Sequence, residues 1–159
     1  MMMNTLTTLL RATYRFDHVL ADWGGSLLSL GLRLYLAWIF FKAGLTKVQD
    51  WDTTIALFTD EYSVPLLSPE LAAVAGTGGE LVLPVLLAAG LLTRPAALGL
   101  FLVNLMAVVA YPQLFSFDCP AAINDHRYWG LLLLVLLAFG PGRLAVDALL
   151  KGRQGAGQA

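Results

Sequence analysis

Residues 25–48, GSLLSLGLRLYLAWIFFKAGLTKV, are mainly apolar, with Arg33, Lys42 and Lys47 as the charged exceptions. A helix of about 20 apolar residues is long enough to cross the hydrocarbon core of a bilayer, which is about 30 Å thick. This stretch therefore predicts a transmembrane helix.

Three further stretches of the chain have the same character, at residues 70–92, 95–111 and 123–140. Pro95 marks a break between the second and third stretches, and Gly140-Pro141-Gly142 should stop the fourth. The sequence thus predicts an all-α fold, an integral membrane four-helix bundle within a domain over residues 24–150.

The composition supports lipid as the main solvent. The 159 residues are 58% hydrophobic and 13% charged, against about 25% charged residues in soluble domains. The net charge of −1 lacks the basic excess of nucleic-acid-binding domains, so no nucleic-acid partner is expected. A single cysteine excludes an internal disulfide and a thiolate cluster. We therefore expect no intrinsic cofactor and no metal site.

The segments between and beside the spans also follow a pattern. Residues 1–23 suit an amphipathic helix on the membrane surface, with the first span as an uncleaved anchor. The loop at residues 49–69 is unusually apolar and is expected to fold back as a short helix or lid. Residues 143–150 predict a short interfacial helix, and the glycine-rich residues 151–159 a disordered tail.

The distribution of Lys and Arg predicts the orientation of the bundle. Only Lys47 and Arg127 fall on one side of the predicted spans. The other side carries Arg11, Arg15, Arg94, Arg143, Lys151 and Arg153. Both termini are therefore predicted to be cytoplasmic, which leaves the acidic loops outside.

Charged groups inside a span are costly, and Arg33 and Glu80 are the deepest of them. Lys42 falls on the opposite face of the first span from Arg33 and should extend toward the outer interface. We expect Arg33 and Glu80 to pair between neighbouring antiparallel spans. Such a pair could simply lock the helix register, or it could line a polar cavity used for quinone chemistry or proton-linked transport.

Other polar residues give weaker signals. Asn104 in the third span is more typical of a bond between helices than of a ligand contact. His126 lies beside Trp129 at the outer edge of the fourth span, where it could serve as a proton relay or only as a surface residue. Asp118 and Cys119 could join His126 at a metal, but their spacing fits no standard site.

The order of these residues is similar to that of the DoxX-like small membrane proteins. The similarity extends from Arg33 to Asp147. It rests on Arg33 in the first span, followed by the F-x-x-x-G-x-x-K pattern of Phe40, Gly44 and Lys47, and on Gly79-Glu80. The further matching positions are Pro84, Gly90, Arg94, His126, Trp129, Gly130, Gly140-Pro141-Gly142 and Asp147.

This resemblance implies a four-helix bundle of the bacterial inner membrane that is linked to membrane redox chemistry. One relative is a subunit of a thiosulfate:quinone oxidoreductase, and others are accessory proteins in oxidative, thiol or copper stress. Arg33, Lys47, Glu80 and His126 match its recurring polar positions. Asn104 and Trp129 are secondary candidates, and the Gly140–Asp147 signature is interpreted as a helix stop followed by an acidic cap.

Three functions remain open on this basis. The first is an accessory redox subunit that binds a quinone, with a partner supplying electrons because the chain has no electron-carrier motif. The second is a non-enzymatic scaffold or assembly factor for a protein partner or a homo-oligomer. The third is a small transporter, although no inverted repeat is evident.

Overall fold

The computed structural model describes residues 13–14, 16–17, 20–116 and 120–156. All regular secondary structure in these residues is helical. Most of the predicted N-terminal segment, residues 1–23, lies outside the described residues. The elements are η1 (Leu20–Gly24), α2 (Gly25–Gln49), α3 (Trp51–Asp60), α4 (Pro69–Ala89), α5 (Thr93–Ala110), η2 (Pro112–Phe115), α6 (Ala121–Phe139) and α7 (Val146–Ala156).

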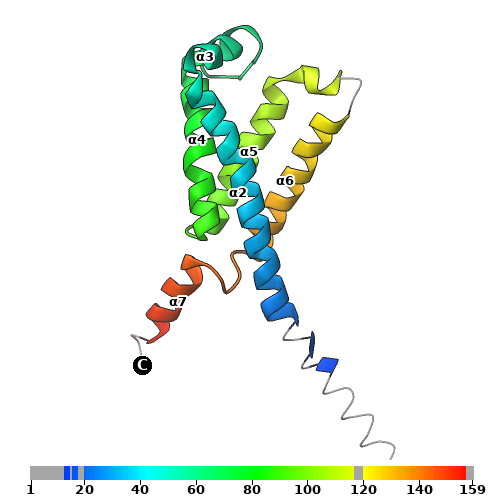
Figure 1. The fold of residues 1–159 in the computed structure, drawn as a ribbon, viewed down its shortest axis with the longest axis vertical. Coiled ribbons are helices and arrows are strands. Elements are labelled where there is room, and N and C mark those ends of the chain that lie inside the picture. The colour runs from blue at the N-terminus through cyan, green and yellow to red at the C-terminus, as the bar shows by residue number, and fades with distance from the viewer. Residues whose placement is uncertain (1–12, 15, 18–19, 117–119, 157–159) are drawn as a thin grey trace, which may run out of the picture.

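The four long helices α2, α4, α5 and α6 pack together. Helix α4 contacts α2 and α5, and α6 contacts α5 and α2, which closes the bundle. The helices run up and down in turn, with α3 at one end and α7 at the other (Figure 1). Toward the α3 end, the pair α2 and α4 separates from the pair α5 and α6 (Figure 1).

Three of these helices are long and apolar enough to span a membrane: Leu20–Gln49, Pro69–Ala89 and Thr93–Ala110. The fourth predicted span corresponds to α6, whose first turns contain the polar run Asn124-Asp125-His126-Arg127. The all-α class and the packing of apolar spans are confirmed. The chain is a multi-pass membrane protein that contacts the lipid bilayer.

Local signals explain where α4 begins and ends. Ser68 accepts a hydrogen bond from the backbone amide of Leu71, and Pro69 occupies the first turn, where its missing N–H costs nothing. Gly90 ends the helix at φ 69°, in the left-handed region that glycine adopts without strain.

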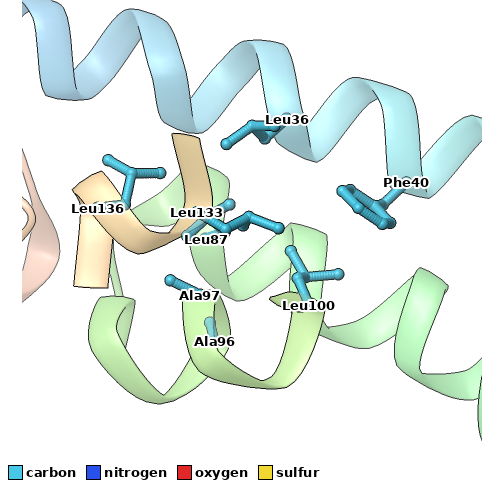
Figure 2. Close-up of a cluster of buried hydrophobic side chains, with 8 residues drawn as sticks. All are labelled: Leu36, Phe40, Leu87, Ala96, Ala97, Leu100, Leu133 and Leu136. Carbon is cyan, nitrogen blue, oxygen red and sulfur yellow. The ribbon is translucent and has the colours of Figure 1, made fainter. Parts of the chain in front are cut away.

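The apolar core lies in the half of the bundle near α7. Each of the four long helices contributes to it, and these side chains lie between the helices (Figure 2). Its buried members are Leu36, Phe40, Leu87, Ala96, Ala97, Leu100, Leu133 and Leu136.

The prediction that residues 49–69 fold back on the bundle is confirmed. Helix α3 packs on α4 through a second cluster formed by Phe58, Ala72 and Ala73. The segment after α3 is tied to α5, because the amide of Ser63 donates to the carbonyl of Ala110 at 2.9 Å.

The C-terminal helix differs from the prediction. Helix α7 extends from Val146 to Ala156, so most of the segment predicted to be disordered, residues 151–159, is helical. The helix predicted within residues 143–150 continues past Leu150, because no proline follows to stop it.

Helix α2 approaches α4 closely at Gly44. A Cβ atom at this position would lie 3.0 Å from the Leu81 side chain and 3.1 Å from the backbone carbon of Glu80. The small residue thus lets α2 rest directly on the backbone of α4, as small residues do between membrane helices.

Replacing Gly44 by valine should therefore push α2 away from α4. We expect Gly44→Val to lower stability by about 1–3 kcal/mol through overpacking, measured as thermal unfolding in detergent. Gly31→Val is the matched control on the same helix, because a Cβ at Gly31 meets nothing within 4 Å. Equal unfolding temperatures for the two variants would contradict this account of the contact.

Candidate functional site

A cavity of about 600 Å³ lies at the α3 end of the bundle. Small residues on the facing helices leave this space open, and α3 with the segment after it forms part of the wall. The lining residues are Ala43, Lys47, Phe58, Tyr62, Val64, Leu67, Ala72, Ala75, Gly76, Glu80, Leu102, Val103, Met106, Ala107, Ala110, Tyr111, Leu114, His126 and Trp129.

A second cavity of about 260 Å³ adjoins the first. The two share six wall residues: Ala43, Glu80, Val103, Ala107, His126 and Trp129. Mostly apolar walls with a few converging polar groups, at a volume of several hundred Å³, are typical of small-molecule sites. The α3 end therefore has the shape and chemistry of a ligand site.

Lys47 and Glu80 form an ion pair in this wall. The Lys47 Nζ lies 2.5 Å from the Glu80 Oε2, and the side chains are 24% and 10% exposed. Lys47 lies in the last turn of α2 and Glu80 near the middle of α4. The pair places two opposite charges, largely out of water, at the edge of an apolar space.

The predicted pair between Arg33 and Glu80 is wrong. Helix α2 lies on α4 in a register that brings Gly44 against Glu80 and Leu81, and brings Arg33 against Ala88 and Gly90. Arg33 and Lys47 occupy one face of α2 but are separated by roughly 21 Å along its axis. Glu80 pairs with Lys47, the cation at the other end of this face.

Arg33 instead holds the α7 end of the bundle together. Its side chain is completely buried and is not part of either cavity wall. The guanidinium donates to the carbonyl of Ala88 at 3.4 Å and to the carbonyl of Leu144. It thereby joins α2 to the end of α4 and to the segment that follows α6.

His126 and Asn104 form a reciprocal pair between α6 and α5. The Asn104 Nδ2 donates to the backbone carbonyl of His126 at 2.9 Å, and the Asn104 Oδ1 lies 2.8 Å from the His126 Nδ1. The ring of Trp129 lies edge-on to His126 at 5.0 Å. Asn104 does serve as the bond between helices that its position predicted, and it does so through a cavity residue.

Tyr62 and Tyr111 complete the polar wall, although no sequence motif marks them as site residues. The rings of Tyr62 and Tyr111 meet edge-on at 5.4 Å. Burial raises the pKa of the Tyr62 phenol, and the nearby Tyr111, Glu61 and Glu80 add to the rise. The phenol therefore stays neutral and can donate a hydrogen bond. The one sequence feature that could have pointed to Tyr62 is the apolar character of the loop at residues 49–69.

Two residues of the predicted metal group, Asp118 and Cys119, lie outside the described residues. Within the described residues, no group of three or more His, Cys, Asp or Glu side chains could hold a metal ion. The cavity wall instead offers a cation, a carboxylate, an imidazole and a phenol on an apolar surface. This set can bind an apolar molecule with a polar head and can exchange protons with it.

Comparison with known proteins agrees with the fold. The model of the DoxX family matches residues 28–113, which is more than half of the chain. The chain belongs to the DoxX family. An uncharacterized protein of Haemophilus influenzae is 33% identical over 137 residues, covering 80% of this chain and 86% of that protein. No solved structure matches.

The DoxX match covers α2 to α5 and includes Arg33, Lys47, Glu80 and Asn104. His126, Trp129 and Asp147 lie beyond the matched region. The ion pair of this DoxX chain is thus within the family region, whereas its histidine is supplied by the helix that follows.

Asp147 is the acidic residue of the Gly140–Asp147 signature, and it caps a different helix from its own. Its carboxylate accepts hydrogen bonds from the amides of Leu92 and Thr93, each at 2.9 Å, at the start of α5. Partial burial acts to raise the pKa of Asp147, but the amides of Thr93 and Leu92 outweigh it, and the pKa falls below its ordinary value. The signature thus anchors α7 to the α4–α5 turn.

Loss of Arg33 should destabilise this DoxX protein. In Arg33→Gln two carbonyl groups lose their donor and the longer side chain leaves space behind, so we expect a loss of about 2–4 kcal/mol, measured by thermal unfolding in detergent. The exposed Arg127→Gln should change stability by no more than a few tenths of a kcal/mol. Wild-type stability in Arg33→Gln would show that the guanidinium does not hold the α7 end of the bundle together.

Asp147 predicts a specific pH dependence. A carboxylate with a lowered folded-state pKa stabilises the fold fully above its unfolded pKa of about 3.9, and this contribution is lost as the pH falls through the folded-state value. Asp147→Asn should therefore be less stable than wild type by about 1 kcal/mol at pH 7. The difference should shrink in acid.

Unfolding midpoints of the two proteins from about pH 7 to about pH 3 would measure this difference. Asp22→Asn is the control, because Asp22 is exposed and lies 3.5 Å from Arg143. A gap between wild type and Asp147→Asn that does not change with pH would rule out the charged cap.

Proposed function

We propose that this DoxX-family protein binds the head group of a lipid-soluble quinone in the cavity at the α3 end and acts as an accessory subunit in membrane redox metabolism. The observation that carries the proposal is the Lys47–Glu80 ion pair in the wall of an otherwise apolar cavity. A quinone combines an apolar body with polar oxygens, and its reduction and oxidation consume and release protons.

The energetics of the ion pair favour a functional role. Taking two charges out of water costs several kcal/mol per ion unless their contact repays it, and apolar residues of similar size often stabilise a fold equally well. Glu80 and Lys47 also lie next to small residues that leave space beside them. Charges retained beside a cavity within a membrane segment are best explained by a ligand or proton that uses them.

Electrons would come from a protein partner. The chain has one cysteine and no motif for a cluster, a haem or a dinucleotide. The protein would then supply the binding site and the proton-exchanging groups, while an associated oxidoreductase would supply or remove electrons. A quinone bound in the membrane would be the molecule that the two subunits share.

The inner membrane of a bacterium is the proposed location, with the α7 end on the cytoplasmic side. The segments at this end carry Arg94 in the first turn of α5, Arg143 just before α7 and Lys151 within α7. An excess of Lys and Arg is typical of cytoplasmic loops. The cavity would then open toward the outer half of the bilayer.

Glu80→Gln should test the quinone site directly. We expect wild-type protein in detergent to show saturable quenching of tryptophan fluorescence on titration with a short-tailed benzoquinone and, under anaerobic conditions, with its hydroquinone, because Trp129 lies in the cavity wall. Glu80→Gln should weaken hydroquinone binding about tenfold or more, since a hydroquinone hydroxyl donates to the carboxylate in a charge-assisted contact worth about 1.5–3 kcal/mol. Glu70→Gln, on the exposed start of α4, is the matched control.

A double variant separates binding from damage to the fold. Lys47→Gln with Glu80→Gln leaves no unpaired charge, so its unfolding temperature should recover relative to Glu80→Gln while its hydroquinone affinity stays low. A wild-type protein with no saturable response and no quinone after purification would overturn the proposal. A co-purifying partner that is retained in Glu80→Gln, with function unchanged, would favour a scaffold instead.

A further inference from the structure

The reciprocal pair of Asn104 and His126 decides which ring nitrogen carries a proton. The backbone carbonyl of His126 can only accept, so the group that faces it at 2.9 Å must be the Asn104 Nδ2. The amide oxygen Oδ1 then faces the His126 Nδ1 at 2.8 Å. Because Oδ1 can also only accept, Nδ1 must carry hydrogen.

The other ring nitrogen is left for a ligand. In the neutral ring with hydrogen on Nδ1, the lone pair is on Nε2. Among the described residues no side chain or backbone group bonds to Nε2, and this atom is not among their buried polar atoms without a partner, which are Arg33 Nε, Thr77 Oγ1 and Thr93 Oγ1. Since the His126 ring lines both cavities, Nε2 is an open acceptor at the site.

We propose that Asn104 is a positioning residue that holds His126 as the Nδ1–H tautomer, so that Nε2 accepts a hydrogen bond from a ligand hydroxyl and the cavity prefers a hydroquinone to the corresponding quinone. The ligand class in this inference rests on the proposed function. The tautomer itself follows from the protein alone.

One further group of the wall agrees with this preference. The Glu80 carboxylate is a second group that can only accept when ionised, and its Oε2 is bound to Lys47. Quinone oxygens can accept from the donors Lys47 and Tyr62, but they cannot bond to Nε2 or to a carboxylate. Hydroquinone hydroxyls can accept from these donors and can also donate to Nε2 and to the carboxylate. The reduced ligand therefore matches more of the groups that the wall offers.

Nitrogen NMR of the histidine ring tests the tautomer without any ligand. The chain contains two histidines, so His18→Gln leaves His126 as the single signal in protein prepared without a histidine tag. With ¹⁵N-labelled histidine, at a pH where the ring is neutral, we expect Nδ1 to show the shift of a protonated nitrogen and Nε2 that of an unprotonated one. The opposite assignment would overturn the inference, whatever the protein binds.

Variants at Asn104 test whether this residue sets the tautomer of His126. Asn104→Ala removes both hydrogen bonds and should give a mixture of tautomers, whereas Asn104→Asp keeps an acceptor beside Nδ1 and should preserve the wild-type tautomer. Asn124→Ala is the matched control on α6, because the Asn124 side chain bonds to Arg127 instead. A pure Nδ1–H ring in folded Asn104→Ala would show that Asn104 does not set the tautomer.

Ligand preference is measured with one short-tailed benzoquinone and its hydroquinone under anaerobic conditions. We expect the hydroquinone to bind the wild-type protein about tenfold more tightly, the ratio that one neutral hydrogen bond can supply. In Asn104→Ala, where Nε2 carries hydrogen part of the time, this ratio should fall toward one.

The outcomes separate this inference from the proposed function. An Nδ1–H ring with tighter hydroquinone binding supports both. Saturable binding in which the quinone binds as tightly as the hydroquinone overturns the preference and leaves the quinone site in place. No binding of either form, with an Nδ1–H ring, refutes the proposed function and the ligand half of this inference together, while the role of Asn104 stands.

Discussion

The register of α2 on α4 is the constraint on which the rest of the structure depends. Gly44 lets the two backbones approach until a Cβ would meet the Glu80 carbonyl carbon at 3.1 Å. Pro84, one turn further along α4, has no N–H to offer to the Glu80 carbonyl, so the α4 ladder is interrupted where α2 makes this contact. Once this level is fixed, Lys47 must reach Glu80, and Arg33 must reach the end of α4.

The same register divides the bundle into two halves with different roles. Near α7, Leu36, Leu87, Leu100 and Leu133 are fully buried, and Arg33 and Asp147 bond the connecting segments to the helix ends. Near α3, alanines and glycine replace large side chains, and the helices leave two adjoining cavities. The tightly packed core near α7 thus fixes the helices at one end, while the cavities lie at the other.

Hydrophobic patterning predicted the four long helices to within a few residues, because lipid requires long apolar helices and makes buried charge costly. The helical period also places Arg33 and Lys47 on one face of α2. The partner of Glu80 could not be predicted, since boundaries uncertain by a few residues shift a helix by about 5 Å or more, enough to exchange one cation for another. The tyrosine pair was missed because Tyr62 enters the site through the fold of a loop, which no periodicity encodes.

Buried polar groups in this protein fall into two kinds, which differ in whether they border a cavity. Arg33 donates to two carbonyls, leaves Nε without a partner and lines neither cavity, so its hydrogen bonds serve only the protein itself. His126 spends Nδ1 on Asn104 and keeps Nε2 available beside open space. The unused Nε2 of His126 makes no hydrogen bond and so contributes nothing to the stability of the fold. Because Asn104 holds the ring in place, Nε2 offers a ligand one acceptor in a fixed direction.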